Sequence, residues 1–385
     1  MSEITLAGLE KRYGDTLAVE DVSVTIDDGE LLCLLGPSGS GKSTTLRMLA
    51  GLETPTDGEI RIGDEDVTDR PAYERTTATV FQDWALFPHK TVLENVAFGL
   101  KMQGMGKDER REQAREMLER VRMGEYADDD PMNLSGGQKQ RVALARSLAV
   151  NPDVLLLDEP LSNLDKRLSE DMQIELREIH AELEETFVHV THDQDEAFTL
   201  ADRIGIMADG TLVQVGEPNE VYENPKNRFI EGFLGDTNFV AGEVERTTAD
   251  SVHVETELGR EVVLPRTAGA DGAAALAAGE SVALSLRPEV LSIEPADAAT
   301  FDGEADRTQP VRTDGSTTNA VVGTIENVLY RGSTIRYSVA VEDTSLFVER
   351  TVADSGAFDA GDEIRISWDG ADVLAFRDDG SRVDL

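Results

Sequence analysis

The sequence predicts an α/β protein that begins with a largely parallel β-sheet domain and ends with a smaller β-rich domain. Over the first ~235 residues, short apolar runs typical of strands alternate with patterns at helical spacing. Within them, residues 154–157 form a continuous apolar run, as buried parallel strands do. After about residue 235 the pattern changes to short alternating segments, which favour small β units. We therefore expect two domains, 1–235 and 236–385.

Each predicted element follows from a local pattern. In the first domain we expect strands at 22–26, 31–35, 154–157, 187–190, 204–207 and 212–215. We expect helices at 41–51, at 108–122, with a solvated charged surface, and at 135–150, just before Pro152. In the second domain, alternating segments typical of strands occur at 252–255, 282–285, 335–341 and 364–368. Loops or insertions are predicted at the Ala/Gly-rich residues 268–279 and the polar residues 297–318.

The composition is that of a globular chain with a large excess of acidic residues. There are 76 Asp and Glu residues against 36 Lys and Arg residues, a formal net charge of −40. This argues against a nucleic-acid partner, because phosphate backbones are bound by basic surfaces. Residues 1–10 lack the features of a signal peptide, and no apolar run approaches the roughly 18–20 residues of a membrane helix. We expect a cytoplasmic protein, held at a membrane only by other subunits, whose single cysteine, Cys33, is buried.

The acidic residues are distributed along the chain. The first 240 residues hold 48 acidic and 24 basic residues, and the remainder holds 28 and 12. Such a surface repels itself at ordinary ionic strength, whereas molar salt, with a Debye length of about 3 Å, screens the repulsion. We interpret the charge as a halophilic surface; an acidic protein from a low-salt host is the alternative.

A glycine-rich segment between the predicted strand at 31–35 and the next helix matches the pattern G-x-x-x-x-G-K-[ST]. In such a loop, backbone N–H groups surround a phosphate, and the following helix adds the partial positive charge of its N-terminus. Lys42 would reach the β- and γ-phosphates of a nucleotide, and the Ser43 hydroxyl would hold Mg²⁺. The candidate binding residues are Gly36, Pro37, Ser38, Gly39, Ser40, Gly41, Lys42, Ser43 and Thr44. The alternative is a glycine-rich turn that matches by accident.

Two acidic residues, Asp158 and Glu159, close the apolar run at 154–157. An aspartate at the end of a strand can hold Mg²⁺, and an adjacent glutamate can orient or deprotonate an attacking water. Such a pair alone is often only a solvated strand end. Together with the phosphate loop, it predicts a site that hydrolyses a nucleotide.

Further motifs complete a family resemblance. Ser135, Gly136, Gly137 and Gln138 open the predicted helix at 135–150. Ser-Gly-Gly alone is an N-cap with a flexible entry, but in this order it resembles the signature of the ATP-binding cassette (ABC) family. Other matching positions are Tyr13, Gln82, residues 162–165 and His192. The resemblance spans residues 1–235, and it departs from the family only at Asn163, where alanine is more usual in related importers.

The resemblance implies a P-loop NTPase fold, with a RecA-like core and a helical subdomain, and a use for each motif. Two copies of the chain would associate head to tail, with ATP between the phosphate loop of one and residues 135–138 of the other. Glu159 would be the general base, His192 would sense the γ-phosphate, and Gln82 would link Mg²⁺ or water to a partner. Tyr13 would stack on adenine. The alternatives are a packed ring for Tyr13, a polar loop residue for Gln82 and a strand-end cap for His192.

Residues 81–89 are rich in apolar and aromatic side chains for so acidic a chain, which predicts a docking surface. In the ABC family this region receives the membrane-spanning subunit. The resemblance therefore implies that permease subunits dock near residues 82–89, at the cytoplasmic face of the membrane, and that a solute-binding protein outside the cytoplasm acts indirectly. The alternative is that Trp84 and Phe87 pack inside the helical subdomain.

In the second domain, residues 285–289 and 330–333 resemble the oligonucleotide/oligosaccharide-binding-like (TOBE) domain of importer ATPases. Residues 96–100 and 233–238 look most similar to members that serve polyamine and ferric-iron uptake. The resemblance thus implies an ATPase for import of spermidine or putrescine. Ferric iron, thiamine, sulfate or a sugar are alternative solutes, and a soluble ABC ATPase without a transport role is a distant alternative.

Overall fold

The computed structural model describes residues 3–183, 185–266, 276–296, 311–313, 316–353, 358–383 and 385. The chain folds as two compact units, Met1–Asn224 and Pro225–Leu385. The division falls before residue 235 because helix α8 (Arg228–Leu234) packs with the second unit. Glu231 of α8 accepts hydrogen bonds from the Ser285 hydroxyl and the Arg287 guanidinium. Residues 225–235, which the sequence analysis assigns to the first domain, thus belong to the second unit.

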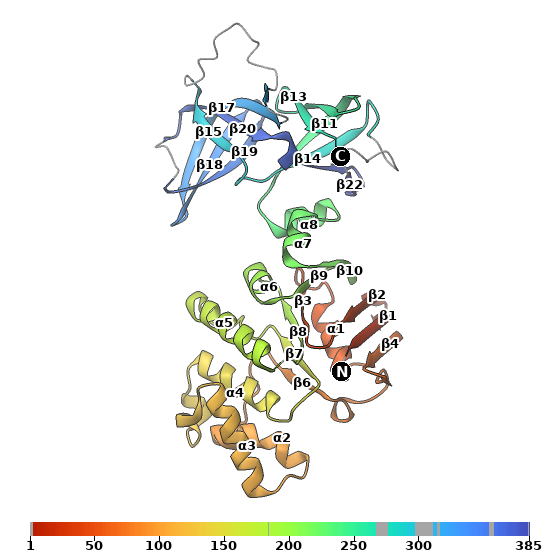
Figure 1. Ribbon diagram of the computed structural model, residues 1–385, viewed down its shortest axis with the longest axis vertical. Helices are drawn as coiled ribbons and strands as arrows, with labels where there is room; N and C mark the ends of the chain where they lie inside the picture. Colours follow the sequence, from red (N-terminus) through yellow and green to blue (C-terminus); the bar gives the residue numbers. More distant parts are fainter. Residues whose placement is uncertain are drawn as a thin grey trace. The chain divides into compact units, whose positions relative to one another are not determined.

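A six-stranded sheet forms the centre of the first unit (Figure 1). Its spatial order is β10-β9-β3-β8-β7-β6, and every pair is parallel except β9 with β10. Its strands are β3 (Leu31–Leu35), β6 (Thr77–Val80), β7 (Val154–Asp158), β8 (Thr186–Thr191), β9 (Arg203–Ala208) and β10 (Thr211–Gly216). All of β3 is buried, which explains its continuous apolar sequence and the burial of Cys33. The predicted α/β core with a largely parallel sheet is confirmed.

A second, antiparallel sheet in the first unit has the order β2-β1-β4-β5. Its strands are β1 (Ile4–Tyr13), β2 (Thr16–Ile26), β4 (Asp57–Ile62) and β5 (Glu65–Asp66). Apolar side chains of β1 and β2 share one buried cluster with those of α1, β3, β7 and β8. This shared core holds the helix that follows the phosphate loop between the two sheets.

The helices of the first unit are α1 (Lys42–Leu49), α2 (Val92–Met102), α3 (Lys107–Arg120), α4 (Gly136–Leu148), α5 (Lys166–Leu183), α6 (Gln194–Leu200) and α7 (Pro218–Glu223). Short 3₁₀ turns occur at Ala72–Glu74, Gly124–Tyr126 and Pro131–Asn133. Helices α2, α3 and α4 gather around their own buried cluster and form the helical subdomain (Figure 1). In the described part of the chain, no helix combines the length and apolar character that crossing a membrane requires.

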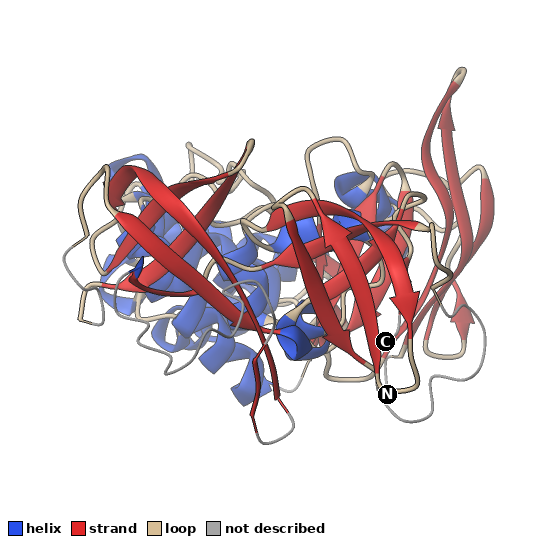
Figure 2. Ribbon diagram, turned by 90° about the horizontal axis from the view of Figure 1, so that it is seen from above, coloured by secondary structure: helices blue, strands red, loops and turns tan. Residues whose placement is uncertain are grey.

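The second unit contains two antiparallel sheets (strands are red in Figure 2). The first has the order β13-β12-β11-β14-β21-β22, and the second has the order β15-β20-β17-β18-β19, with β16 paired to β17. Their bounds are β11 (Asn238–Thr247), β12 (Ser251–Thr256), β13 (Arg260–Pro265), β14 (Ser281–Leu286), β15 (Ser292–Pro295), β16 (Val311–Thr313), β17 (Ser316–Tyr330), β18 (Thr334–Val341), β19 (Thr344–Thr351), β20 (Glu363–Asp369), β21 (Leu374–Arg377) and β22 (Arg382–Val383). A 3₁₀ turn, Gly370–Asp372, lies between β20 and β21.

Two buried asparagines join these two sheets. The Asn238 side chain accepts a hydrogen bond from the Phe347 N–H and donates to the Phe347 carbonyl, at 2.7 and 2.9 Å. Asn319 pairs with both backbone groups of Val263 in the same way, at 2.9 and 3.1 Å. Each asparagine amide thus pairs with a backbone N–H and a carbonyl of the other sheet, as buried polar groups require.

The two predicted insertions of the second unit are described only in part. Of residues 268–279, only 276–279 lie within the described part of the chain, where they form a turn. Of residues 297–318, those at 311–313 and 316–318 are strand rather than loop, because β16 and β17 pair there. The remainder of that segment lies outside the described residues.

Candidate functional site

The predicted site residues follow four neighbouring parallel strands. The phosphate loop follows β3, His192 follows β8, Asp158 and Glu159 close β7, and Gln82 comes two residues after β6. In the sheet these strands stand side by side in the order β3, β8, β7, β6. Because the strands are parallel, their carboxyl ends share one edge, where ligands of open α/β sheets bind. Residues far apart in the sequence are therefore brought to one place.

The phosphate loop has the backbone that its glycines allow. Gly39 and Gly41 adopt φ angles of 83° and 97°, in the left-handed region that favours glycine. Gly41 is the N-cap of α1 and provides no side-chain hydrogen bond, so the first N–H groups of the helix remain for a ligand. A β-carbon at Gly36 would lie 2.2 Å from the Met207 carbonyl oxygen, so no other residue fits there. The loop therefore meets the requirements for binding a phosphate.

The Lys42 side chain lies folded against its own loop. Its ammonium group donates to the carbonyl oxygens of Gly36 and Pro37, at 2.7 and 2.8 Å. Burial lowers the pKa of Lys42, and the nearby carboxylates of Glu159 and Asp158 oppose that shift. A buried cation held mainly by neutral carbonyls would gain from an incoming anion.

Asp158 lies next to the start of α1. Its carboxyl accepts a hydrogen bond from Ser43, and burial raises its pKa although that hydrogen bond lowers it. A hydroxyl and a carboxylate are oxygen ligands of the kind that Mg²⁺ prefers. The pair Ser43 and Asp158 therefore fits a magnesium ion next to the phosphate loop, as the sequence predicts.

Glu159 and His192 are in direct contact. His192 Nδ1 lies 3.0 Å from Glu159 Oε2. The backbone of Glu159 is left-handed, with φ 45°, and its N–H donates to the Val190 carbonyl of β8 at 3.0 Å. Strained backbone at non-glycine residues is concentrated at functional sites. Glu159 thus combines a strained backbone, an adjacent imidazole and a place at the ligand-binding edge of the sheet.

Gln82 is connected to the loop after Glu159. Its side-chain amide donates to the Ser162 hydroxyl at 3.2 Å, and this hydroxyl donates to the Glu159 carbonyl at 2.9 Å. The Asn163 side chain donates to the Gln82 carbonyl at 2.9 Å. The residue that departs from the family pattern therefore has a defined contact. Sequence reasoning missed this contact, because its signal was only an unusual residue type in a known motif.

The predicted signature residues begin helix α4 as a capping box. The Ser135 hydroxyl accepts from the Gln138 N–H at 3.4 Å, and the Gln138 side chain accepts from the Ser135 N–H at 2.9 Å. A β-carbon at Gly136 would lie 3.0 Å from Leu164, and one at Gly137 would lie 2.9 Å from Leu168. The glycines therefore allow close packing on the next loop and helix, while the Ser135 O–H remains able to donate to a ligand.

Tyr13 lies at the end of β1 with 45% of its surface exposed. The Lys11 ammonium lies 5.0 Å from the centre of its ring. The Tyr13 ring is therefore half-exposed, and part of its surface is accessible to a planar base.

The segment 81–89 is less exposed than the sequence suggests. Trp84 and Phe87 are only partly exposed, and the Phe87 ring packs against Phe98 with centroids 4.5 Å apart. The side chains that do reach solvent include those of Asp83 and His89. Phe87 thus packs on the helical subdomain, as the alternative for this ring states, and the polar side chains of the segment are exposed.

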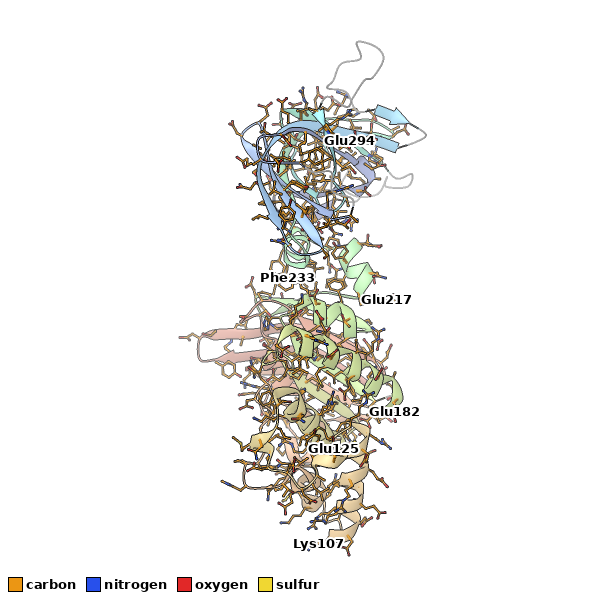
Figure 3. The ribbon with its side chains drawn as sticks, turned by 90° about the vertical axis from the view of Figure 1, so that its left-hand side faces the viewer. Lys107, Glu125, Glu182, Glu217, Phe233 and Glu294 are labelled. Carbon is orange, nitrogen blue, oxygen red and sulfur yellow. The ribbon has the colours of Figure 1, made fainter. Side chains whose placement is uncertain are left out.

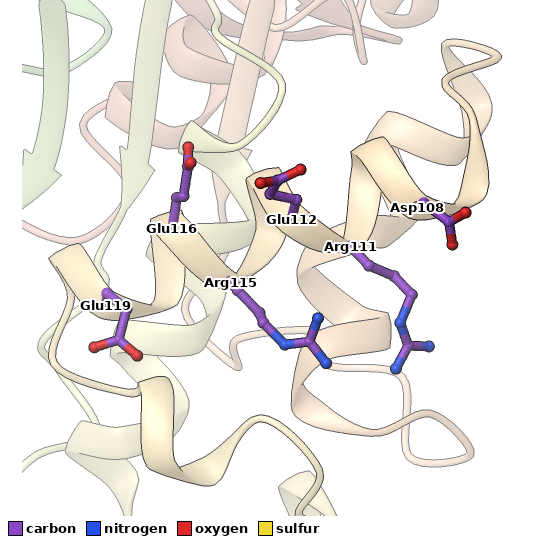
Figure 4. A pocket seen from close by; sticks show the side chains of 6 residues that line it. All are labelled: Asp108, Arg111, Glu112, Arg115, Glu116 and Glu119. Atoms are coloured by element: carbon purple, nitrogen blue, oxygen red, sulfur yellow. The ribbon is translucent and has the colours of Figure 1, made fainter.

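A shallow hollow of about 570 Å³ lies elsewhere in the first unit, along helix α3 (Figure 4). Six charged side chains of this one helix line it: Asp108, Arg111, Glu112, Arg115, Glu116 and Glu119. In Figure 4 the two arginines point to one side and Glu112 and Glu116 point to another. The hollow is the solvated surface predicted for this helix and contains none of the site residues described above.

These features define a class of protein, a P-loop nucleotide hydrolase with a helical subdomain. A family profile described as "ABC transporter" matches residues 19–162, and one described as "TOBE domain" matches residues 284–376. The chain belongs to the ABC importer ATPases that carry a TOBE domain. It is therefore an ATPase of the ABC transporter type.

Relatives match over nearly their whole length. The chain is 42% identical to "Spermidine/putrescine import ATP-binding protein PotA" of Pseudomonas fluorescens, covering 90% of this chain and 89% of that protein. It is 40% identical to the PotA protein of Rubrobacter xylanophilus, covering 96% and 93%. It is 44% identical to "Fe(3+) ions import ATP-binding protein FbpC 1" of Rhizobium meliloti, covering 88% of each.

Two solved structures resemble the cassette portion. One is the dimeric post-hydrolysis state of the ATP-binding cassette MJ0796 bound to ADP and Pi, with 34% identity and a TM-score of 0.50, covering 56% of this chain and 98% of that one. The other is cbiO1 from Clostridium perfringens, part of the ABC transporter complex cbiONQ, with 31% identity and a TM-score of 0.54. It covers 57% of this chain and 90% of that one.

Proposed function

We propose that this chain is a peripheral membrane ATPase that powers uptake of a polyamine through permease subunits. The observation that supports the ATPase chemistry best is the shared sheet edge. There Lys42 and Ser43, at the start of the helix after β3, meet Asp158 and Glu159 at the end of β7 and His192 after β8. Binding energy, electrostatic stabilisation and a base for water are all available at this edge.

Each residue has a distinct part in the proposed reaction. Lys42 and the N–H groups at the start of α1 would bind the phosphates, and Ser43 and Asp158 would hold the metal ion, with Gln82 as the further ligand that the family resemblance implies. Mg²⁺, when bound, neutralises charge on the β- and γ-phosphates. Glu159 orients water and accepts its proton, and His192, 3.0 Å away, holds the Glu159 carboxylate and responds to the γ-phosphate.

We propose that two copies associate head to tail around two nucleotides, with Ser135, Gly136, Gly137 and Gln138 of each copy completing the site of the other. The exposed Tyr13 ring stacks on adenine. The support is the start of α4, where the capping box pairs the Ser135 and Gln138 N–H groups and leaves those of Gly136 and Gly137 to face a ligand, and the dimeric ABC cassette among the similar structures. ATP would hold the copies together, and hydrolysis would release them, so that nucleotide biases a two-state equilibrium.

Permease subunits would dock at residues 82–89. This segment joins Gln82, at the site edge, to helix α2 of the helical subdomain. The solute-binding protein outside the cytoplasm would meet the permease and not this chain. We infer polyamine as the solute because several relatives over most of the chain are named for spermidine and putrescine. Ferric iron is the second candidate, because one relative of similar identity is named for it.

The ATPase assignment predicts opposite behaviour of two variants. Glu159→Gln should bind MgATP and accumulate as a stable dimer with turnover reduced by about 10²-fold or more, since only the proton acceptor is lost. Lys42→Ala should lose both nucleotide binding and the dimer. Size-exclusion chromatography with MgATP, with phosphate release measured in parallel, checks both variants. Wild-type phosphate release by Glu159→Gln would overturn the assignment of the base.

The solute is tested by uptake. Cells that lack their own polyamine and ferric-iron uptake would express this chain together with candidate permease and solute-binding subunits from the same organism. Labelled spermidine, putrescine and ferric iron would be compared, with Lys42→Ala as the inactive control. Accumulation of spermidine or putrescine is expected, and accumulation of iron alone would reject the polyamine assignment while keeping the ATPase.

A further inference from the structure

The backbone of the segment after Gln82 is strained at two consecutive residues. Trp84 and Ala85 adopt φ angles of 61° and 46°, although neither is glycine. The turn is tight, since the Trp84 N–H donates to the Phe81 carbonyl and the Ala85 N–H donates to the Asp83 carbonyl. Two adjacent left-handed residues persist only where surrounding contacts hold them.

The contact that holds this turn comes from helix α4. Arg146 Nη1 donates to the Ala85 carbonyl at 2.6 Å, and Nη2 donates to the Trp84 carbonyl at 2.8 Å. The planar guanidinium thus binds two successive carbonyls with its two terminal nitrogens, which a lysine cannot reproduce. The central carbon of the Arg146 guanidinium, Cζ, also lies 5.6 Å from the centre of the Phe87 ring. Burial lowers the pKa of Arg146, so this cation is in part desolvated.

The N-terminal end of the same helix also contacts the turn. The Lys139 ammonium lies 5.7 Å from the centre of a Trp84 ring, and a β-carbon at Gly136 would be 3.7 Å from that side chain. The Trp84 indole N–H is buried and has no hydrogen-bond partner among the described residues. A strained backbone and an unsatisfied buried donor at the same residue indicate an arrangement that a partner could change.

Both ends of the segment are fixed elsewhere. At one end, Asn163 and Ser162 bind Gln82. At the other, the buried Asn95 of α2 accepts from the Phe87 N–H at 2.7 Å and donates to the Phe87 carbonyl at 3.2 Å. Among the described residues, Arg146 therefore supplies the hydrogen bonds that join the middle of the segment to α4.

We propose that Arg146 is a positioning residue that couples residues 82–87 to helix α4, so that displacement of this segment moves the start of that helix. The inference rests on the proposed function in one respect, the docking of the permease at residues 82–89. Arg146 makes no contact with nucleotide in this scheme. It transmits the position of the docking segment to the residues that complete the partner's site, Ser135, Gly136, Gly137 and Gln138.

The experiment uses Trp84 as its own probe. The sequence contains two tryptophans, so Trp368→Phe in the full chain leaves Trp84 as the only indole. In this background, Arg146→Met should shift the fluorescence emission of Trp84 to longer wavelength and increase its quenching by acrylamide. Both changes are expected because the turn relaxes away from α4 and the indole becomes more exposed to water. Arg146→Lys should give an intermediate result. Ser147→Ala is the matched control, because it removes a hydrogen bond from α4 to the Thr79 carbonyl of β6 and leaves the turn alone.

A second pair of variants tests the backbone strain independently of Arg146. Ala85 is exposed, so its side chain can change without disturbing a core. Ala85→Gly should behave as wild type, because glycine accepts a positive φ, whereas the β-branched Ala85→Val should reproduce the effect of Arg146→Met. Thermal unfolding of every variant, measured in parallel, identifies any that fails to fold. A folded Arg146→Met protein with unchanged Trp84 emission and quenching would overturn the proposal, as would a silent Ala85→Val.

Coupling is measured on the complex with permease. Arg146→Met and Ala85→Val should reduce permease-stimulated ATP hydrolysis by about tenfold or more, since small displacements of positioned groups have large kinetic effects. Binding of MgADP to the isolated chain should stay unchanged, because the phosphate loop is intact. Altered Trp84 emission with full stimulation would show that Arg146 only holds the turn, and it would overturn the proposed coupling. A wild-type chain that permease does not stimulate would count against the proposed function instead.

Discussion

At the scale of single residues, several polar groups of the site are buried or adopt a backbone conformation that costs free energy in the folded protein. Lys42 is buried against neutral carbonyls, and burial raises the pKa of Asp158. Glu159 adopts a left-handed backbone, which costs an L-residue about 1–2 kcal/mol. Such costs are expected where residues are arranged for a ligand and not for the stability of the empty protein.

This view predicts how Asp158→Asn changes stability with pH. A carboxyl whose pKa is raised by folding favours the folded state only in its protonated form, so its ionised form destabilises the folded state above the unfolded pKa of about 4. Asp158→Asn should therefore raise the thermal midpoint of the nucleotide-free protein at pH 7, with a gain that disappears as the pH falls below about 4. Calorimetry from pH 3 to pH 7 measures this difference. A lower midpoint at pH 7 would contradict it.

Asn163→Ala tests whether the unusual residue of this chain matters. The variant removes one exposed hydrogen bond to the Gln82 carbonyl, which is 2.9 Å long. Such a bond contributes about 0.5–1.5 kcal/mol, so kcat/KM for ATP should fall by about tenfold at most. Steady-state hydrolysis, compared with Gln82→Ala, measures the effect. A loss as large as that of Gln82→Ala would assign Asn163 a larger role than positioning Gln82.

At the scale of elements, the start of helix α4 has two uses. Its capping box pairs the Ser135 and Gln138 N–H groups, and its glycines let Leu164 and Leu168 approach closely. The same N-terminus is proposed to face the nucleotide of the partner copy. A substitution at Ser135 is therefore expected to change both the stability of helix α4 and the binding of the partner copy's nucleotide.

Two substitutions at Ser135 separate these uses. Ser135→Ala should cost about 1 kcal/mol of stability, while Ser135→Gly should cost only a few tenths, because glycine is a tolerable N-cap. Both variants remove the hydroxyl, so both should weaken formation of the MgATP-bound dimer if the hydroxyl contacts the nucleotide. Denaturant unfolding and dimer formation are measured on each. Normal dimer formation by Ser135→Gly would restrict Ser135 to capping.

At the scale of the whole molecule, the acidic surface is less uniform than a count by halves suggests. Residues 101–150 hold 10 basic and 9 acidic residues, whereas residues 151–200 hold 3 and 14. Many of the acidic side chains are exposed, as are Glu125, Glu182 and Glu217 in Figure 3. The helical subdomain is thus nearly neutral, and self-repulsion arises in the rest of the chain.

The proposed halophilic surface predicts a steep dependence of stability on salt. Between dilute buffer and molar KCl the thermal midpoint should rise continuously, because screening removes repulsion among exposed carboxylates. Sucrose, which stabilises proteins without screening charge, is the control. A thermal midpoint that rises equally with KCl and with sucrose, or with neither, would contradict the halophilic interpretation.

Two truncations test the division of the chain. A chain that ends at Asn224 should bind MgADP as the full chain does, because the first unit keeps its own core. A chain that ends at residue 240 retains α8 but lacks Ser285 and Arg287, which bind Glu231 in the full chain. This longer piece should be no more stable than the shorter one, because α8 has lost the unit against which it packs. A clearly higher thermal midpoint of the longer piece would favour the boundary at 235.

Several properties of this protein follow from its sequence alone. The phosphate loop, the signature residues and the pair Asp158 and Glu159 are contiguous patterns, in which residue type and spacing carry the chemistry. The apolar runs predicted a parallel sheet, because burial on both faces leaves few polar residues in a strand. Net charge is likewise a property of composition.

Other properties were decided only by the tertiary structure. Three sets of hydrogen bonds join segments that are distant in the sequence. They link His192 with Glu159, Asn163 with Gln82, and Arg146 with Trp84 and Ala85. No local pattern predicts such contacts, because they depend on how the strands are ordered in the sheet and how α4 packs. For the same reason α8 belongs to the second unit: its sequence continues from the first, but the buried bond between Glu231 and Arg287 ties it to β14.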